Sequence, residues 1–163
     1  MSSDPNALVY DFRADLSAFG DEVVGGATKV LQEGSNTTFE AIVLGNEFGP
    51  GVAVDTGFAR SSFRVGINQV EEGPSEPPGH IPGRRPGVPF MGPIRGDIPI
   101  ARAQLGDQVF ITTVVEYPQF LEFEPKTRRY GPLAGQSTEF LDPVEARFTD
   151  IIDDAADRVG YGR

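Results

Sequence analysis

Eight of the fourteen prolines fall between residues 73 and 99, and this concentration limits the fold more than any other feature of the sequence. Proline fixes φ and lacks a backbone N–H, so a regular helix or a central strand is not expected there. We predict an extended arm or long loop over 73–99, and long loops of this kind are usually functional or disordered. The eight are Pro74, Pro77, Pro78, Pro82, Pro86, Pro89, Pro93 and Pro99.

Before this excursion, apolar residues recur every three or four positions, the period of a helix with one buried face. Asp4 is a candidate N-cap, with Pro5 at the first helical position. We therefore predict an N-terminal helical segment over 1–46. Three glycines leave a kink or break as an open alternative, because each costs about 1 kcal/mol in a helix interior. The stripe is Leu8, Phe12, Leu16, Phe19, Val23, Ala27, Val30 and Leu31, and the glycines are Gly25, Gly26 and Gly34.

The remaining segments predict two strands and a second helix. Residues 58–70 alternate loosely between apolar and polar, and 109–115 (VFITTVV) is rich in β-branched residues, which is typical of a buried strand. A C-terminal helix is predicted over 142–159, with Asp142 as N-cap and Glu145 completing a capping box. The fold class is therefore α+β, a single domain over 1–163. Both long helices are expected to pack on one antiparallel sheet.

Composition excludes several classes of protein. The absence of cysteine removes disulfides, thiolate zinc sites and cysteine nucleophiles, and it fits a reducing cytosol. A formal net charge of −10 repels phosphate backbones, so sequence-specific or tight nucleic-acid binding is not expected. No apolar run approaches the roughly 20 residues of a membrane span, and no signal peptide is recognised. The composition therefore indicates a soluble protein with one domain of ordinary size.

The turn Val54-Asp55-Thr56-Gly57 is the main candidate for chemistry, because hydrophobic-Asp-Thr-Gly is the active-site signature of aspartic proteases. A chain this short would have to dimerise, as retroviral proteases do. Against this hypothesis, bulky Phe58 stands where those enzymes place a small residue, and the preceding segment has a helical pattern. We therefore interpret Val54, Asp55, Thr56 and Gly57 as a structural turn in which Asp55 caps backbone amides, and we predict no catalytic site.

Other candidate sites are weaker. His80 is the only histidine and has no soft ligand to share a zinc ion with. The acidic residues of the last helix match no EF-hand spacing and are interpreted as a solvated face. Arg95-Gly96-Asp97 spells an integrin-recognition tripeptide in a chain without a secretion signal. The acidic residues are Asp150, Asp153, Asp154 and Asp157. No cofactor-binding or metal-binding residue is predicted.

Three stretches in order resemble the tail-completion and head–tail joining (neck) proteins of tailed bacteriophages, the group often called HK97-gp10-like. They are 52–63 (VAVDTGFARSSF), 117–123 (YPQFLEF), and the closing strand and amphipathic helix from Phe140 to Val159. The long first helix fits as well, so the likeness covers most of the chain outside 70–105. The family commonly has proline where this chain has Ala53.

The resemblance implies a non-enzymatic virion protein that forms a homo-oligomeric ring, expected to be a hexamer, in the neck of the virion. As a tail terminator or tail-completion protein, the ring would join the portal or head-closure protein to the tail tube. Genomic DNA would pass through without sequence-specific binding, and assembly would take place in the host cytoplasm. Expected assembly contacts are Arg84, Arg85, Arg128, Arg129, Tyr117 and Glu122. Two alternatives stay open: a retroviral-type aspartic protease using Asp55, and a binding module that presents the proline-rich loop as a ligand.

Overall fold

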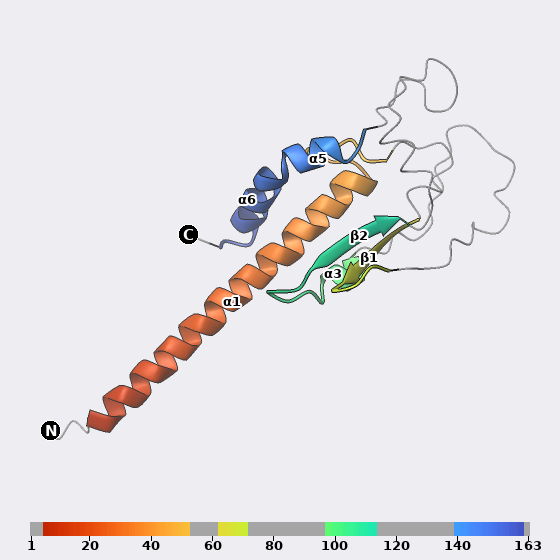
Figure 1. Cartoon of the computed structure of the whole chain (residues 1–163). Coiled ribbons are helices and arrows are strands. Elements are labelled where there is room, and N and C mark those ends of the chain that lie inside the picture. The colour runs from red at the N-terminus through yellow and green to blue at the C-terminus, as the bar shows by residue number, and fades with distance from the viewer. Residues whose placement is uncertain (1–4, 53–61, 72–96, 114–138, 162–163) are drawn as a thin grey trace, which may run out of the picture.

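A computed structural model of the chain describes residues 5–52, 62–71, 97–113 and 139–161. These residues form an α+β fold with a long first helix, a two-stranded antiparallel sheet and a helical C-terminal segment (Figure 1). The predicted fold class is confirmed at this level. The helices are α1 (Pro5–Val43), α3 (Asp97–Ile100), α5 (Asp142–Ala146) and α6 (Phe148–Arg158), and the strands are β1 (Phe63–Ile67) and β2 (Val109–Thr113).

Helix α1 is continuous for 39 residues, about 60 Å at a rise of about 1.5 Å per residue. The alternative of a kink or break at its glycines is not realised. Two of these glycines lie where other side chains approach the helix closely. A Cβ at Gly34 would lie 2.9 Å from Ile152 Cδ1, and one at Gly26 would collide with the Tyr161 ring. Packing against these side chains offsets the low helix propensity of glycine.

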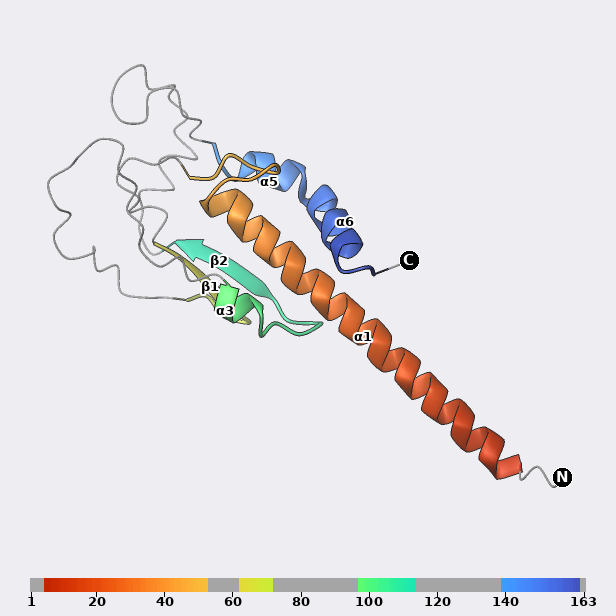
Figure 2. The same ribbon diagram turned by 180° about the vertical axis from the view of Figure 1, so that it is seen from behind.

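Helices α5 and α6 lie along one side of α1, and the sheet lies on its other side, so α1 is the middle layer (Figures 1 and 2). The prediction that both helices pack on one sheet is therefore wrong for α6, which packs on α1. Two strands of five residues each are too narrow to cover two helices side by side. The apolar face of α6 is buried against the C-terminal half of α1 instead, around Gly34.

The sheet pairs β1 with β2 antiparallel, in a register that places Phe63 opposite Thr113 and Ile67 opposite Val109. Beside this ladder, the Ser62 and Thr113 hydroxyls are hydrogen-bonded at 2.8 Å. Strand β1 buries Phe63 and Val65, as its alternation predicts, but Gly66 of the other face is also buried and Ile67 is only partly buried. Strand β2 was predicted to be buried, but every one of its side chains is partly exposed. Among the described residues β2 pairs only with β1, so it lies at the edge of the core.

The hydrophobic core lies between the C-terminal end of α1, the sheet and the start of α5. The Phe63 and Phe140 rings meet edge to face, with centroids 6.2 Å apart and an interplanar angle of 85°, a favourable aromatic geometry. Val109 and Ile111 of β2 pack against this core. The core comprises Phe39, Ala41, Ile42, Val43, Phe48, Val52, Phe63, Val65, Ile100, Phe140, Val144 and Ile151.

The C-terminal helical segment differs from its prediction in two ways. Leu141 occupies the N-cap position and no side chain caps the helix, so Asp142 is the first helical residue and the capping box with Glu145 is absent. The segment is also divided at Arg147, whose φ of −111° and ψ of 14° separate α5 from α6. Phe140 lies in no strand, so the closing strand of the family resemblance is not seen at that residue.

The proline-rich excursion predicted over 73–99 ends earlier than expected. Residues 97–99 begin the single helical turn α3, and Pro99 fits there because the first helical N–H groups have no partner within a helix. Residues 73–96 lie outside the described residues. Among the described residues, no helix combines the length and apolar character required to cross a bilayer.

Candidate functional site

Most of the residues that the sequence singled out lie outside the described residues. This holds for the turn Val54, Asp55, Thr56 and Gly57, and for His80. It also holds for all the expected assembly contacts, which are Arg84, Arg85, Tyr117, Glu122, Arg128 and Arg129. The structural turn and these contacts therefore stay predictions. Of the integrin-recognition tripeptide, only Asp97 is described, as the first residue of α3.

The acidic face of α6 is described, and Asp150 and Asp154 on it form ion pairs. Asp150 accepts from Arg147 Nε at 3.4 Å, and Asp154 lies 2.8 Å from Arg158 Nε. Within the described part of the chain, no group of three acidic or histidine side chains could hold a metal ion. These aspartates contribute to electrostatic contacts within the fold.

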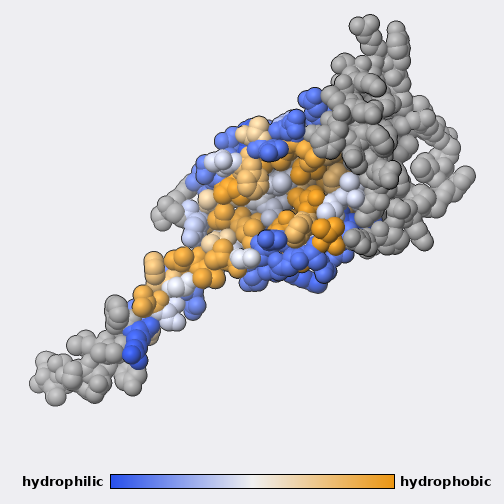
Figure 3. Space-filling model, viewed as in Figure 1, coloured by the Kyte–Doolittle hydropathy of each residue, from blue (hydrophilic) through white to orange (hydrophobic). Residues whose placement is uncertain are grey.

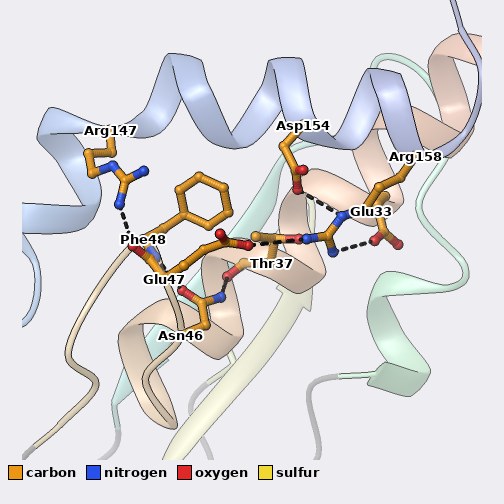
Figure 4. Close-up of polar contacts among 8 residues, drawn as sticks. All are labelled: Glu33, Thr37, Asn46, Glu47, Phe48, Arg147, Asp154 and Arg158. Carbon is orange, nitrogen blue, oxygen red and sulfur yellow. Dashed lines mark hydrogen bonds and ion pairs between the residues drawn. The ribbon is translucent and has the colours of Figure 1, made fainter.

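One group of polar contacts lies where the end of α1 turns back (Figure 4). Asn46 holds this turn with both ends of its amide: Oδ1 accepts from the Phe48 amide at 2.9 Å, and Nδ2 donates to the Thr37 carbonyl at 3.1 Å. The first contact is an Asx turn, which is the local hydrogen bond that makes asparagine common in turns. Phe48 is thereby directed into the core, where it is buried.

Arg147 joins the divided C-terminal segment to this turn. Its guanidinium lies 4.7 Å from the centroid of the Phe48 ring, within the range of a cation–π contact, and donates to the Glu47 carbonyl. The break between α5 and α6 occurs at this same residue. The residue that separates α5 from α6 is therefore also the residue that contacts the turn after α1.

Arg158 makes a second junction, at the other end of α6. It lies within ion-pair distance of Glu33 on α1 at 3.2 Å, Glu47 at 3.6 Å and Asp154 at 2.8 Å. The hydrogen bond to Glu33, together with the charges of these carboxylates, raises the pKa of Arg158 above its ordinary value. The guanidinium is about half exposed, so each pair contributes modestly, in the range of about 0 to 1 kcal/mol. The cluster orients α6 on α1 and contains no nucleophile beside a base.

A third polar cluster connects the two strands. Asn68 has a φ of 60° and donates from Nδ2 to Asp107 Oδ1 at 2.7 Å, while its own Oδ1 accepts from the Gln108 amide at 2.8 Å. Asp107 Oδ2 also accepts from the Gln104 amide at 2.7 Å. From α1, Gln32 donates to the Ala103 carbonyl at 2.8 Å and holds this loop on the helix.

We expect this loop to loosen at low pH. The side-chain bond from Asn68 and the backbone bond from Gln104 lower the pKa of Asp107 below its ordinary 3.8. Because the folded pKa is lowered, the contribution of Asp107 to stability is present above about pH 4 and is lost as pH falls through the folded pKa. The protection factor of the Gln104 amide, which is the intrinsic exchange rate at a given pH divided by the NMR-measured rate, should therefore fall as Asp107 becomes protonated. The Asp107→Asn variant should show faster exchange at neutral pH, and equal exchange in both proteins across pH 2 to 7 would contradict this expectation.

These polar junctions could hardly be predicted from the sequence. The Asn46-Glu47-Phe48-Gly49 segment has turn composition, and this was the only local signal available. Arg147 contacts Glu47, which lies 100 positions earlier in the chain, and Arg158 contacts Glu33, which lies 125 positions earlier. A contact between residues so far apart in the chain produces no periodic pattern in the sequence.

An exposed apolar surface lies on the half of α1 that projects beyond the rest of the described fold (Figures 1 and 3). Leu16 is 59% exposed, Phe19 63%, Val23 38% and Val24 51%. Tyr161 and α6 cover the helix only from about Gly26 onward. We refer to Leu16, Phe19, Val23 and Val24 as the exposed stripe. A contiguous apolar patch of this kind is typical of an interaction surface.

The exposed stripe can bind another apolar surface, whereas the described polar clusters make contacts within the fold.

Comparisons of the chain with protein-family models, with curated proteins and with solved structures found no match.

Proposed function

We propose that the chain is a structural subunit of the neck of a tailed bacteriophage, a tail-completion or head–tail joining protein that acts as a ring of copies. The proposal rests on the resemblance of 52–63, 117–123 and the C-terminal segment to that family. The observation that carries it within the described residues is the exposed stripe on the projecting half of α1. A subunit that functions in an assembly needs such a surface, and a monomeric enzyme does not.

The charge of the chain supports the same role. A net charge of −10 gives a ring whose surfaces repel phosphate, so DNA can slide through its opening without being held. The partners of the ring are the portal or head-closure protein on one side and the tail tube protein on the other. The ring is expected to be a hexamer, and the chain takes part in no chemical reaction.

Negative-stain electron microscopy of the purified full chain tests this proposal. We expect ring-shaped particles with a central opening, either alone or after mixing with the tail tube protein, and we expect the chain in purified virions. Absence of rings under both conditions, together with absence from virions, would overturn the proposal. Proteolysis that pepstatin inhibits and Asp55→Asn abolishes would replace it with the aspartic-protease hypothesis.

A further inference from the structure

The exposed stripe has an asymmetric distribution of charge on its two flanks. At about 3.6 residues per turn, Arg13 lies about a quarter turn to one side of the line through Leu16, Phe19 and Val23. Asp15 and Glu22, seven residues apart, lie together on the other side. All three charged side chains are exposed. The stripe therefore has one basic flank and one acidic flank in its N-terminal part.

This asymmetry distinguishes the two ways in which a second copy could pair through the stripe. In an antiparallel pair the same flanks meet, so Asp15 and Glu22 of one copy would face Asp15 and Glu22 of the other. In a parallel pair opposite flanks meet, so Arg13 of each copy would face Asp15 of the other. Like charges across a helix pair destabilise it and opposite charges stabilise it.

We propose that the projecting half of α1 docks against the same half of a second copy, in parallel and in register. Leu16, Phe19 and Val23 then pack against their own equivalents, and Arg13 pairs with Asp15 on both sides of the contact. The stripe has the 3-and-4 spacing that lets two helices share an apolar seam. A patch that packs against its own equivalent forms an isologous contact, which joins two copies about a two-fold axis.

The inference rests on the proposed function in one respect, that the chain works as an assembly of copies. It adds a surface through which two copies pair, and the direction of that pairing. It does not require the ring, because a parallel pair is complete with two copies.

Sedimentation equilibrium of the full chain tests the docking surface. Phe19→Asp should raise the dissociation constant of the assembly by at least about tenfold, because it places a charge at an apolar contact. Ala14→Asp adds the same charge on the opposite, exposed face of the helix and is the matched control, for which little change is expected. A chain that is monomeric at all concentrations, or equal effects of the two variants, would overturn the proposal.

Single-cysteine variants test the direction, since the chain has no cysteine of its own. Leu16→Cys and Val23→Cys lie about 10 Å apart along the helix. A disulfide needs Cα atoms within about 7 Å, so a parallel in-register pair cross-links efficiently at both positions, and an antiparallel pair at one position at most. Ala14→Cys, on the opposite face, should not cross-link. Cross-linking at only one stripe position would overturn the parallel arrangement.

A charge exchange gives an independent readout. Arg13→Asp or Asp15→Arg alone should weaken association by roughly fivefold, and the two together should restore it. Failure of the double variant to restore association would contradict the pairing of Arg13 with Asp15.

A lipid surface is another partner that could cover the exposed stripe. A monomer that binds phosphatidylglycerol vesicles through Phe19 would identify that partner and also overturn the proposal.

The outcomes separate this inference from the proposed function. Rings without cross-links at the two stripe positions would remove the inference and leave the neck role. Cross-linked parallel pairs without rings, from a chain absent from virions, would remove the neck role and leave the inference.

Discussion

Substitution of Gly51 by alanine is expected to lower the free energy of unfolding by roughly 2 to 5 kcal/mol, which is a large part of the stability of an ordinary domain. Gly51 has a φ of 71°, a conformation that residues with a Cβ rarely adopt. An added Cβ would also lie 2.5 Å from the Leu44 carbonyl carbon and would collide with the Gly45 backbone. Backbone atoms at such distances cannot move aside as the end of a flexible side chain can.

Gly160 provides a matched control for this variant. Its φ is also 71°, but nothing lies within 4 Å of the position that a Cβ would occupy. Gly160→Ala should therefore show only the cost of the left-handed conformation, about 1 to 2 kcal/mol. Urea denaturation followed by circular dichroism measures both variants. Equal losses of stability in the two variants would mean that the close approach of residues 44–45 to Gly51 adds nothing to the cost of Gly51→Ala.

Truncation of Ile151 to alanine is the second large effect, with an expected loss of about 2 to 5 kcal/mol. Ile151 lies on α6, is fully buried, and belongs to the core shared with the C-terminal end of α1. The substitution removes apolar contacts and leaves a cavity between two helices that are close-packed around Gly34. Loss of this contact should loosen α6 from α1 more than it affects the sheet.

Phe148→Ala is the corresponding control on the same helix. Phe148 is larger than Ile151 but is 51% exposed, so its truncation should change the free energy of unfolding by about 0.5 kcal/mol or less. Thermal and urea unfolding of both variants give the comparison. A loss for Phe148→Ala equal to that for Ile151→Ala would show that α6 is not buried through the Ile151 face.

Some of the structural features behind these expectations could be predicted from the sequence, and others could not. The long first helix was predictable, because its apolar residues repeat at the helical period over many turns, and a repeated pattern outweighs three glycines. The β-branched run that became β2 was also recognisable. The division of the last helix at Arg147 was not predictable, because the capping signals at Asp142 and Glu145 favoured a single start and no later interruption.

The candidate site was the least predictable part. Residues such as Asp55 were singled out by similarity to motifs, and they lie outside the described residues. The exposed stripe was present in the sequence as Leu16, Phe19 and Val23, but the sequence predicted that they would be buried. A period of three and four identifies an apolar face, and it does not say whether the partner of that face belongs to the same chain.

The sequence by itself determined the long first helix, the two strands and the helical character of the C-terminal segment, because hydrophobic periodicity and turn residues act over a few positions. Only the tertiary structure decided which surfaces those segments share. It placed α6 against α1, since Gly34 permits close approach and the sheet is narrow. It also left residues 13–25 of α1 exposed, since α6 and the C-terminal Tyr161 reach only as far as Gly26. The physical reason is that burial depends on contacts between residues that are distant in sequence. A local pattern of apolar residues does not specify which distant residues will make those contacts.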